Sequence, residues 1–379
     1  MLFAFLGGLG LFLFGIKSMS EGLQLVAGDR LRQILEKGTK TPVRGVLTGA
    51  LVTALIQSSS GTTVLTVGLV NAGLLNLRQA IGIIMGANIG TTLTAYLIGF
   101  KLSHYALPII AVGVILLFFF KNKRINYIGQ VLFGFGLLFY GMDIMGGGLK
   151  PLRDSAFFIG LMSDVENNAF LGVLIGTLFT AIVQSSSATI GVLQELANQG
   201  VITYHQAIPI LFGDNIGTTV TALLAGIGAT VAARRASLTH FLFNVMGTVI
   251  FIPLFYFGVF EQIVRLFTDY IYVLLPGFEG SWQTLNIKLQ IAQTHGVFNV
   301  SNTLIQLPFV ALLASLVTKF IPGGQEVDSK IKYLEPRFFG NPSVALANAN
   351  RETLRMGGIA SEALKNASNY FFDKKTEYR

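Results

Sequence analysis

The most restrictive feature of this chain is an internal duplication. When the sequence is shifted by 127 residues against itself, residues 45–95 align with residues 172–222 without a gap, and 27 of the 51 aligned positions are identical. At a shift of 126 the match continues upstream, where Gly8 aligns with Gly134. This period is far above the roughly 20–50 residues of solenoid repeats. The duplication therefore predicts two large halves of similar fold, as in secondary transporters.

The composition places both halves in a membrane. Hydrophobic residues make up 52% of the chain and charged residues only 12%, whereas soluble domains contain about 25% charged residues. Of 27 basic and 19 acidic side chains, 16 lie in residues 320–379. A body so poor in charge excludes a soluble enzyme, a nucleic-acid-binding protein and a disordered chain. The net charge of +8 fits basic cytoplasmic loops, and the absence of cysteine excludes disulfides and thiolate metal sites.

Several apolar stretches are long enough to cross a bilayer, which requires about 20 residues. They are residues 2–20, 79–98, 104–120, 128–148, 206–226, 237–258 and 290–319. Two further apolar stretches, residues 46–75 and 172–200, are each interrupted by Gln-Ser-Ser-Ser. Irregular backbone at membrane depth must face protein or a watery cavity, so we expect a re-entrant hairpin or two half-helices there. Each half then has an odd number of crossings, which predicts that the second half is inverted relative to the first.

Loop charges predict the orientation. The loop over residues 21–45 carries five basic residues, whereas its counterpart over residues 149–171 carries two. Because cytoplasmic loops are rich in Lys and Arg, we expect the basic loops and the charged C-terminal tail in the cytoplasm, with residues 149–171 and the N-terminus outside. The residues behind this prediction are Arg30, Arg32, Lys37, Lys40, Arg44, Lys121, Lys123, Arg124, Arg234 and Arg235.

These patterns predict an all-α polytopic protein of the inner cell membrane with two inverted repeats, each containing a Gln-Ser-Ser-Ser hairpin. We expect four regions. They are repeat 1 (residues 1–127), repeat 2 (128–258), an interfacial segment with a final transmembrane helix (259–320), and a cytoplasmic linker with the start of a helical regulatory domain (321–379). The interfacial segment covers residues 259–289, and a crossing there would invert the tail.

The Gln-Ser-Ser-Ser interruptions are candidate anion-binding sites. Hydroxyl and carboxamide groups can donate hydrogen bonds to anion oxygens, and a helix that begins just after the serines would direct free backbone N–H groups at the same point. A single copy would be explained as serines joining packed helices, but two copies at matching positions indicate a shared substrate site. The candidate residues are Gln57, Ser58, Ser59, Ser60, Gln184, Ser185, Ser186 and Ser187.

The Gln-Ser-Ser-Ser motif contains no Lys or Arg, although a buried anion needs a compensating charge. We therefore expect a cation to bind with the anion, at the two Asn-Ile-Gly-Thr-Thr segments. Their amide and hydroxyl oxygens suit a hard cation, and glycines such as Gly86 and Gly213 would loosen the helix and free carbonyl oxygens. A glycine-rich packing seam is the alternative. The candidate ligands are Asn88, Thr91, Thr92, Asn215, Thr218, Thr219, Thr62, Thr189 and Asp214.

With these motifs the sequence resembles the type II sodium/phosphate cotransporters, in their bacterial branch. The resemblance covers about residues 1–320 and rests on the paired Gln-Ser-Ser-Ser and Gly-x-Asn-Ile-Gly-Thr-Thr motifs, with support from the His-x-x-x-Asn segments that begin at His240 and His295. It implies sodium-coupled uptake of inorganic phosphate by alternating access, with phosphate between the two Gln-Ser-Ser-Ser motifs and no cofactor besides the coupling ions. It also implies that residues 343–379 begin a PhoU-type helical domain.

Acidic residues depart from the family pattern. Electrogenic animal members carry an aspartate after the first Asn-Ile-Gly motif, whereas this chain has no acidic residue between Thr92 and Lys121. Asp214 replaces an alanine of the first half, and we interpret it as a cation ligand because an acid at membrane depth is usually functional. Glu195 replaces a glycine of the first half; it could pair with a basic group, bind a proton or lie near the interface.

Four other polar residues are secondary candidates for binding substrate, protons or sodium. For the two histidines, a hydrogen-bonded role in the core is an equally good explanation. The amide oxygens of the two asparagines suit sodium. The four residues are His240, His295, Asn244 and Asn299.

Three alternatives to sodium-coupled phosphate import remain open at this stage. A transporter could carry sulfate, arsenate or a carboxylate, or use protons. A membrane receptor could sense phosphate without moving it. An intramembrane serine hydrolase is disfavoured, because the duplication makes both serine runs equivalent whereas a hydrolase needs one nucleophile against one base.

Overall fold

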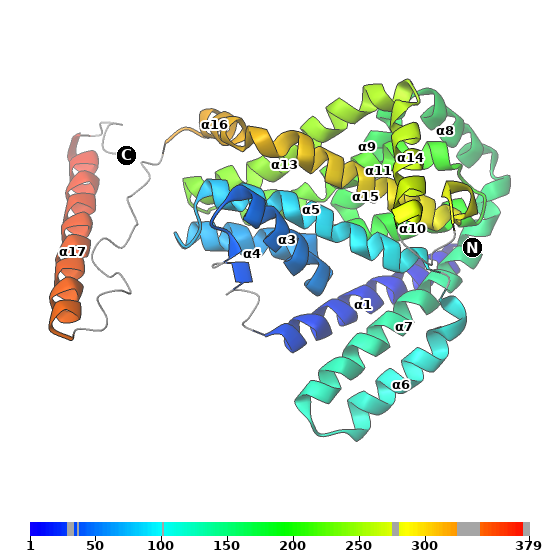
Figure 1. Cartoon of the computed structure of the whole chain (residues 1–379), viewed down its shortest axis with the longest axis horizontal. Helices are drawn as coiled ribbons and strands as arrows, with labels where there is room; N and C mark the ends of the chain where they lie inside the picture. The colour runs from blue at the N-terminus through cyan, green and yellow to red at the C-terminus, as the bar shows by residue number, and fades with distance from the viewer. Residues whose placement is uncertain (29–33, 36–37, 101, 275–279, 324–341, 374–379) are drawn as a thin grey trace. The chain divides into compact units, whose positions relative to one another are not determined.

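A computed structural model describes residues 1–28, 34–35, 38–100, 102–274, 280–323 and 342–373. Arg30, Arg32 and Lys37 of the predicted cytoplasmic loop lie outside these residues. The chain divides into two units, Met1–Gly323 and Gly324–Arg379. All regular elements within the described ranges are helices (Figure 1), which confirms the predicted all-α class.

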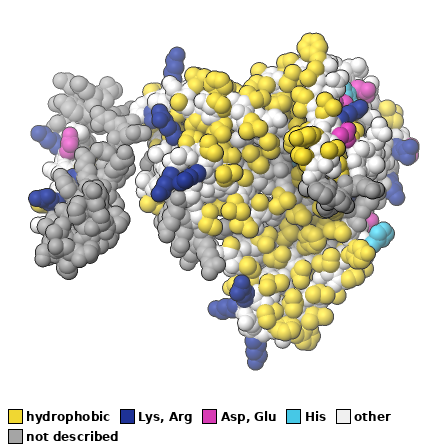
Figure 2. All heavy atoms as spheres, in the orientation of Figure 1, with side chains coloured by type: hydrophobic (Ala, Val, Ile, Leu, Met, Phe, Trp, Pro, Cys, Tyr) yellow, Lys and Arg dark blue, Asp and Glu magenta, His cyan; other side chains and the backbone are white. Residues whose placement is uncertain are grey.

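Six helical segments are long and apolar enough to cross a membrane within the described part of the chain. They are α1 (Leu2–Ala27), α5 (Leu77–Gly99), α7 (Lys123–Leu149) with its 3-10 extension, α11 (Tyr204–Gly217) with α12 (Thr219–Ala225), α13 (Val231–Tyr256), and α15 (Ile287–Gln306) with α16 (Val310–Phe320). Their apolar surface fits this placement, since hydrophobic side chains are spread over the visible face of Met1–Gly323 and charged side chains lie mainly near its edges (Figure 2).

Two stretches of the chain between these helices have structural detail that the sequence patterns did not give. The stretch predicted to span at residues 104–120 forms one apolar helical segment, Ser103–Phe119, of which α6 (Ala106–Phe119) is the α-helical part. It is shorter than the six segments above, and its crossing of the membrane stays a prediction. The stretch predicted as an external loop at residues 149–171 contains α8 (Ala156–Asn167), which bends by 118° into α9 (Ala169–Val183). Neither length nor bend is set by loop composition, so sequence patterning did not identify them.

Each Gln-Ser-Ser-Ser motif lies at the tip of a helical hairpin, as predicted. In the first half α3 (Pro42–Ile56) is followed by α4 (Ser59–Asn71), and in the second α9 is followed by α10 (Ser186–Asn198). The Thr53 hydroxyl donates to the Thr62 hydroxyl oxygen at 2.8 Å across the break. Residues nine apart in a continuous helix would be separated by about 13 Å along its axis, so the chain must reverse direction between α3 and α4.

The second hairpin has the same internal contact. The hydroxyl oxygens of Thr180 and Thr189 lie 2.8 Å apart, and these residues correspond to Thr53 and Thr62 at the shift of 127. The sequence duplication is therefore a duplication of local structure at both hairpins.

Helices α1 and α7 pack against each other through equivalent residues of the two halves. A Cβ atom on Gly8 would overlap the backbone of Met145, and one on Gly134 would overlap the backbone of Met19. Gly8 corresponds to Gly134 and Met19 to Met145 at the shift of 126, so each contact recurs with the halves exchanged. Early residues of α1 meet late residues of α7, so the two helices run antiparallel. When each contact is repeated with the two halves exchanged, the two helices are related by a local two-fold axis perpendicular to them.

Within each half the first arm of the hairpin packs closely on the helix that carries Asn-Ile-Gly. A Cβ atom on Gly86 would overlap the carbonyl oxygen of Val46, and one on Gly213 would overlap that of Val173. These glycines are required because two backbones meet there.

The expectation that glycines unwind the Asn-Ile-Gly segments is wrong in the first half. Helix α5 is continuous from Leu77 to Gly99. In the second half the helix is interrupted, because α11 ends at Gly217 and α12 begins at Thr219.

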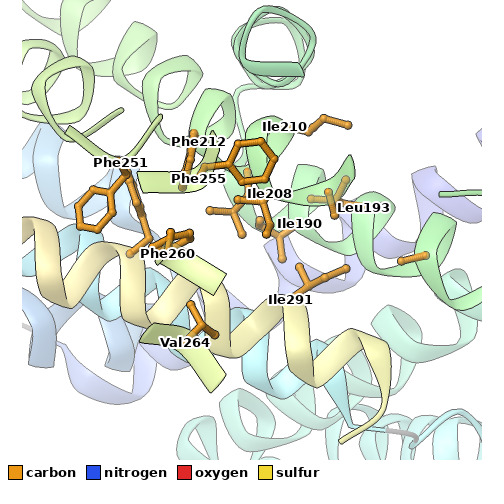
Figure 3. Close-up of a cluster of buried hydrophobic side chains, with 14 of the residues drawn as sticks. Ile190, Leu193, Ile208, Ile210, Phe212, Phe251, Phe255, Phe260, Val264 and Ile291 are labelled. Carbon is orange, nitrogen blue, oxygen red and sulfur yellow. The ribbon is translucent and has the colours of Figure 1, made fainter. Parts of the chain in front are cut away.

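A large buried apolar cluster joins α10, α11, α13, α15 and α14 (Val259–Leu274) (Figure 3). The ring centroids of Phe212 and Phe251 lie 4.8 Å and 5.1 Å from that of Phe298, and such close packing stabilises contacts between membrane helices through van der Waals attraction. Helix α14 adds Phe260 and Val264 from one face. This cluster holds α11 between α13 and α15. Helix α11 carries the candidate cation ligands Asp214 and Asn215.

Helix α14 lies in the segment predicted to be interfacial, of which residues 275–279 are not described. It is amphipathic, because its charged residues Glu261, Arg265 and Asp269 recur one turn apart along one side, whereas Leu266 and Val273 belong to an apolar side. An amphipathic helix of this kind suits a membrane surface, and the interfacial location of α14 stays a prediction.

The second unit contains α17 (Pro342–Asp373). The apolar spacing of residues 343–379 predicted a helix there, and its regulatory role stays a prediction.

Candidate functional site

One cavity of about 470 Å³ is lined by residues from both halves of the chain. All eight residues of the predicted anion site line it, and the remaining lining residues come from α1. The eight are Gln57, Ser58, Ser59, Ser60, Gln184, Ser185, Ser186 and Ser187. Residues separated by 127 positions in the sequence therefore share one polar space, which is the arrangement that a symmetric ligand site requires.

The backbone turns sharply at the glutamine of each motif. Gln57 and Gln184 have φ angles of 55° and 56°, and they are the non-glycine residues with positive φ in the described chain. The left-handed conformation costs a non-glycine residue about 1–2 kcal/mol, and such strain is concentrated at functional sites. The turn ends one half-helix and allows the next to begin at once.

The second half-helix of each hairpin begins within the serine run, at Ser59 and at Ser186, two residues earlier than the sequence suggested. Ser58 is the N-cap of α4 and its hydroxyl oxygen accepts a hydrogen bond from the Gly61 N–H at 3.0 Å. Ser185 caps α10 in the same way, accepting from the Ala188 N–H at 3.2 Å. The first residues after each cap have backbone N–H groups without an intrahelical acceptor. Both helices therefore direct N–H donors and the positive end of a dipole at the serines.

The two glutamines differ in their hydrogen bonds. Gln57 is buried; its amide donates to the Ala54 carbonyl at 2.5 Å and its oxygen accepts from the Thr94 hydroxyl at 2.9 Å. Gln184 is exposed and has no such bond among the described residues. The predicted equivalence of the two motifs thus holds for the serines, whereas only Gln184 has its carboxamide free in this conformation.

Helix α1 forms the third wall of the cavity. The Ser20 hydroxyl donates to the Ile56 carbonyl at 2.5 Å and so holds α1 to the end of α3. Lys17 and Glu21 also line the cavity, with the Lys17 ammonium 3.9 Å from the Glu21 carboxylate. Sequence reasoning missed these residues because no motif marks them; the only available signal was a basic and an acidic residue one turn apart in the first apolar stretch.

The Asn-Ile-Gly-Thr-Thr residues are separate from this cavity. The amides of Asn88 and Asn215 donate to the carbonyls of Ile84 and Leu211 at 2.9 Å, in matching geometry. The threonine hydroxyls also donate to backbone carbonyls of their own helices, which leaves lone pairs of their oxygens available as ligands. These threonines are Thr91, Thr92, Thr218 and Thr219.

Two predicted cation ligands, Thr62 and Thr189, lie inside the hairpins. Both hydroxyls are buried and engaged with the threonine of the opposite arm. Asp214 joins this arrangement in the second half only, because its Oδ1 accepts from the Thr180 hydroxyl at 2.9 Å. Its Oδ2 is buried with no hydrogen-bond partner among the described residues, so one carboxylate oxygen is free to bind a cation.

Glu195 forms a buried ion pair. Its carboxylate lies 2.5 Å from the ammonium of Lys288, at the start of α15. Of the three interpretations that the sequence left open, pairing with a basic group is correct. Lys288 was not foreseen, because it lies 93 positions further along the chain and no local pattern connects the two.

The two histidines of the secondary set do not line the serine cavity. His240 and His295 are buried in α13 and α15, each one turn before an asparagine. Neither is therefore positioned as a base for a serine nucleophile, which removes the structural basis for the hydrolase alternative.

Comparison with known proteins agrees with these features. Residues 11–147 and 148–271 match the Na+/Pi-cotransporter family as two consecutive segments. YjbB of Escherichia coli strain K12, named "Putative inorganic phosphate export protein", is 29% identical over 362 residues, which are 95% of this chain and 63% of YjbB. The chain thus spans less than two thirds of that relative. YqeW of Bacillus subtilis strain 168, named "Uncharacterized protein", is 29% identical over 314 residues, 82% of this chain and 95% of YqeW.

A human protein is also similar. "Sodium-dependent phosphate transport protein 2B" is 24% identical over 402 residues, covering 66% of this chain and 58% of its own length. No solved structure matches the chain. The family match covers more than half of the chain and coincides with the duplicated, membrane-spanning region, so the chain belongs to the Na+/Pi-cotransporter family.

Proposed function

We propose that this protein is a secondary active symporter that imports inorganic phosphate together with sodium by alternating access. The observation that carries the proposal is the single cavity lined by both Gln-Ser-Ser-Ser motifs. Phosphate would bind between them, held by serine hydroxyls and by the N–H groups at the starts of α4 and α10.

The charges around the cavity support coupling to a cation. Lys17 is the basic residue among those that line it, and it pairs with Glu21. The formal charges of this pair cancel, so the pair does not neutralise a bound dianion. A bound phosphate therefore requires positive charge from another source, and sodium ions at the Asn-Ile-Gly-Thr-Thr segments and at Asp214 would supply it.

The proposed direction follows from the driving force. A symporter moves both solutes down their combined gradient, so an inward sodium gradient drives phosphate inward. The same protein would release phosphate if the combined gradient were reversed, and in this respect the export function in the name of YjbB is compatible with one mechanism.

Alternating access would follow from inverted halves. The reciprocal contacts of α1 and α7, with Gly8 and Gly134 in equivalent roles, support a two-fold axis in the membrane plane. We further propose location in the inner membrane with the charged C-terminal tail in the cytoplasm, supported by the basic residues Lys121, Lys123 and Arg124 on a loop predicted to lie on the same side.

The test is uptake of radiolabelled phosphate into proteoliposomes under an imposed sodium gradient. Uptake should require sodium, should not be replaced by potassium or by a proton gradient, and should resist competition by sulfate. Equal uptake with potassium would refute sodium coupling. No uptake by folded protein under any gradient would favour a phosphate sensor.

Two serine substitutions test the shared site. Ser59→Ala and Ser186→Ala should each raise the KM for phosphate about tenfold or more, because each removes a hydrogen bond to a charged ligand. Ser163→Ala is the control, since Ser163 is exposed on α8. If both cavity variants behave like the control, phosphate does not bind between the motifs.

A further inference from the structure

Helices α13 and α15 carry the same sequence pattern. Residues 240–248 and 295–303 are identical at five of nine positions, including the histidine, the asparagine one turn later and the threonine one turn after that. The two segments are 55 residues apart, a spacing unrelated to the main duplication. The similarity therefore calls for a common structural role.

The two helices have equivalent contacts with the two halves. The Thr248 hydroxyl donates to the Phe212 carbonyl on α11, and the Thr303 hydroxyl donates to the Met85 carbonyl on α5, both at 3.5 Å. Phe212 and Met85 correspond at the shift of 127. Helix α15 thus packs on the first half as α13 packs on the second, although the sequence suggested that α15 was a final span added after both repeats.

In the second half the register places Asn244 beside the Asn-Ile-Gly-Thr-Thr segment. The rings of His205 and Phe255 stack at 4.5 Å, and Thr248 contacts Phe212 further along, so α11 and α13 run antiparallel. Asn244 lies one turn before Thr248 on the same face. This register brings it level with Ile216–Thr219.

In the first half Asn299 occupies the same position. The Tyr96 hydroxyl donates to the Gln293 side-chain oxygen, and Thr303 contacts Met85, so α5 and α15 are also antiparallel. Asn299, one turn before Thr303, is therefore level with Ile89–Thr92.

Both asparagines have an amide oxygen without a partner. Each amide nitrogen donates to the carbonyl of the histidine one turn earlier, His240 or His295, at 3.0 Å. A carbonyl can only accept, so the nitrogen faces it and the oxygen is the free atom. The Oδ1 atoms of Asn244 and Asn299 are buried and accept no hydrogen bond from any described residue. Burying such an oxygen without a partner is unfavourable.

The threonines level with these oxygens present further ligands. The hydroxyls of Thr92 and Thr219 donate to the carbonyls of Ile89 and Ile216, both at 2.7 Å. Their protons are thereby engaged, and the lone pairs of their oxygens remain available. Thr92 and Met85 share one face of α5, as Thr219 and Phe212 share one face of α11, because each pair is seven residues apart.

We propose that α15 and α13 complete two equivalent sodium sites, one formed by Asn299 with Thr92 in the first half and one by Asn244 with Thr219 in the second. Neutral oxygens suit a hard monovalent cation. Neither pair includes a carboxylate, so binding is weak enough for an ion that must be released in each cycle. The inference rests on the proposed sodium coupling, and it identifies α13 and α15 as helices that supply sodium ligands.

The experiment measures sodium-dependent stabilisation and phosphate binding of purified protein, with choline chloride keeping the ionic strength constant. Asn299→Ala and Asn244→Ala should each raise the sodium concentration for half-maximal stabilisation at least about tenfold, and phosphate binding should recover at high sodium. Asn302→Ala is the matched control: Asn302 is also buried on α15, but it donates to the Phe243 carbonyl and accepts from Gln306.

Volume-conserving variants keep the test decisive if an alanine variant does not fold. Asn299→Asp and Asn244→Asp retain an oxygen and add charge, so each should bind sodium at least as tightly as the unmodified protein. Unchanged sodium dependence in all Asn244 and Asn299 variants would overturn the inference and leave only water as the partner of these oxygens. If the unmodified protein itself shows no sodium dependence, the proposed coupling fails instead.

Discussion

The carboxylate of Glu195 and the ammonium of Lys288 lie 2.5 Å apart, with 4% and 8% of their side-chain surfaces exposed. The pair connects α10, whose first residues line the serine cavity, to α15. Next to it, the Gln194 amide donates to the backbone carbonyls of Ala95 and Lys288 at 3.0 Å and 2.8 Å. The second half-helix of repeat 2 is thus tied to both α5 and α15, whereas the first half has a glycine, Gly68, in place of Glu195.

Breaking this ion pair should destabilise the protein strongly. Lys288→Met leaves a buried carboxylate without its partner, and we expect a loss of about 3–5 kcal/mol of folding free energy. The double variant Glu195→Gln with Lys288→Met removes both charges and should recover much of this loss. Thermal unfolding of the single and double variants in detergent measures the coupling. Additive effects would show that the two charges do not interact.

Lys17 should attract phosphate electrostatically. Lys17→Gln should raise the KM for phosphate about two- to fivefold at low ionic strength, the size expected for an exposed charge, and the effect should fade as salt screens the interaction. Glu21→Gln should lower the KM, because it removes a negative charge from the same cavity. Transport assays at two ionic strengths test this, and an effect of Lys17→Gln that is independent of salt would contradict it.

Asp214 should contribute to cation binding and to the charge moved per cycle. Asp214→Asn keeps an acceptor for the Thr180 hydroxyl but removes the charge, so the sodium affinity should fall about tenfold or more. The charge translocated per phosphate should change as well. Current and uptake measured together in proteoliposomes report both quantities. Asp143→Asn, on an exposed position of α7, is the control, and identical behaviour of the two variants would exclude Asp214 as a ligand.

The glycines where α5 packs on α3 and where α11 packs on α9 should be intolerant of a methyl group. Gly86→Ala and Gly213→Ala would each place a Cβ atom against a backbone carbonyl, and such overpacking costs about 1–3 kcal/mol. Gly68→Ala, inside α4 with no atom near its Cβ position, should instead stabilise by about 0.5–1 kcal/mol. Melting temperatures should therefore shift in opposite directions. If the melting temperature of Gly68→Ala also fell, the loss of stability would reflect a general loss of glycine flexibility and not the close backbone contact.

The parts of the fold that sequence could predict are those encoded within a short stretch. The break at Gln57-Ser58 is visible as a polar interruption of an apolar run, and the two halves are visible as a repeat. The position of Lys17 in the cavity depends on how α1 packs against α3, through the bond between Ser20 and Ile56. Such contacts between distant segments have no local signature.

The pairing of α15 with the first half shows the same limitation. Its motif was recognised, but the partner helix follows only from contacts such as that of Thr303 with Met85. Likewise, the glycines of α5 were interpreted as points of flexibility. In the structure they allow close packing, because glycine permits both and only the neighbouring backbone decides between them.

The antiparallel seam of α1 and α7 is symmetric in itself. Because Gly8 meets α7 as Gly134 meets α1, this surface is self-complementary, like the interface of a symmetric homodimer. One polypeptide therefore holds both partners of a pairing that a half-length chain could form only with a second copy of itself. Away from this seam the two halves differ, since the first has Ala87 where the second has Asp214.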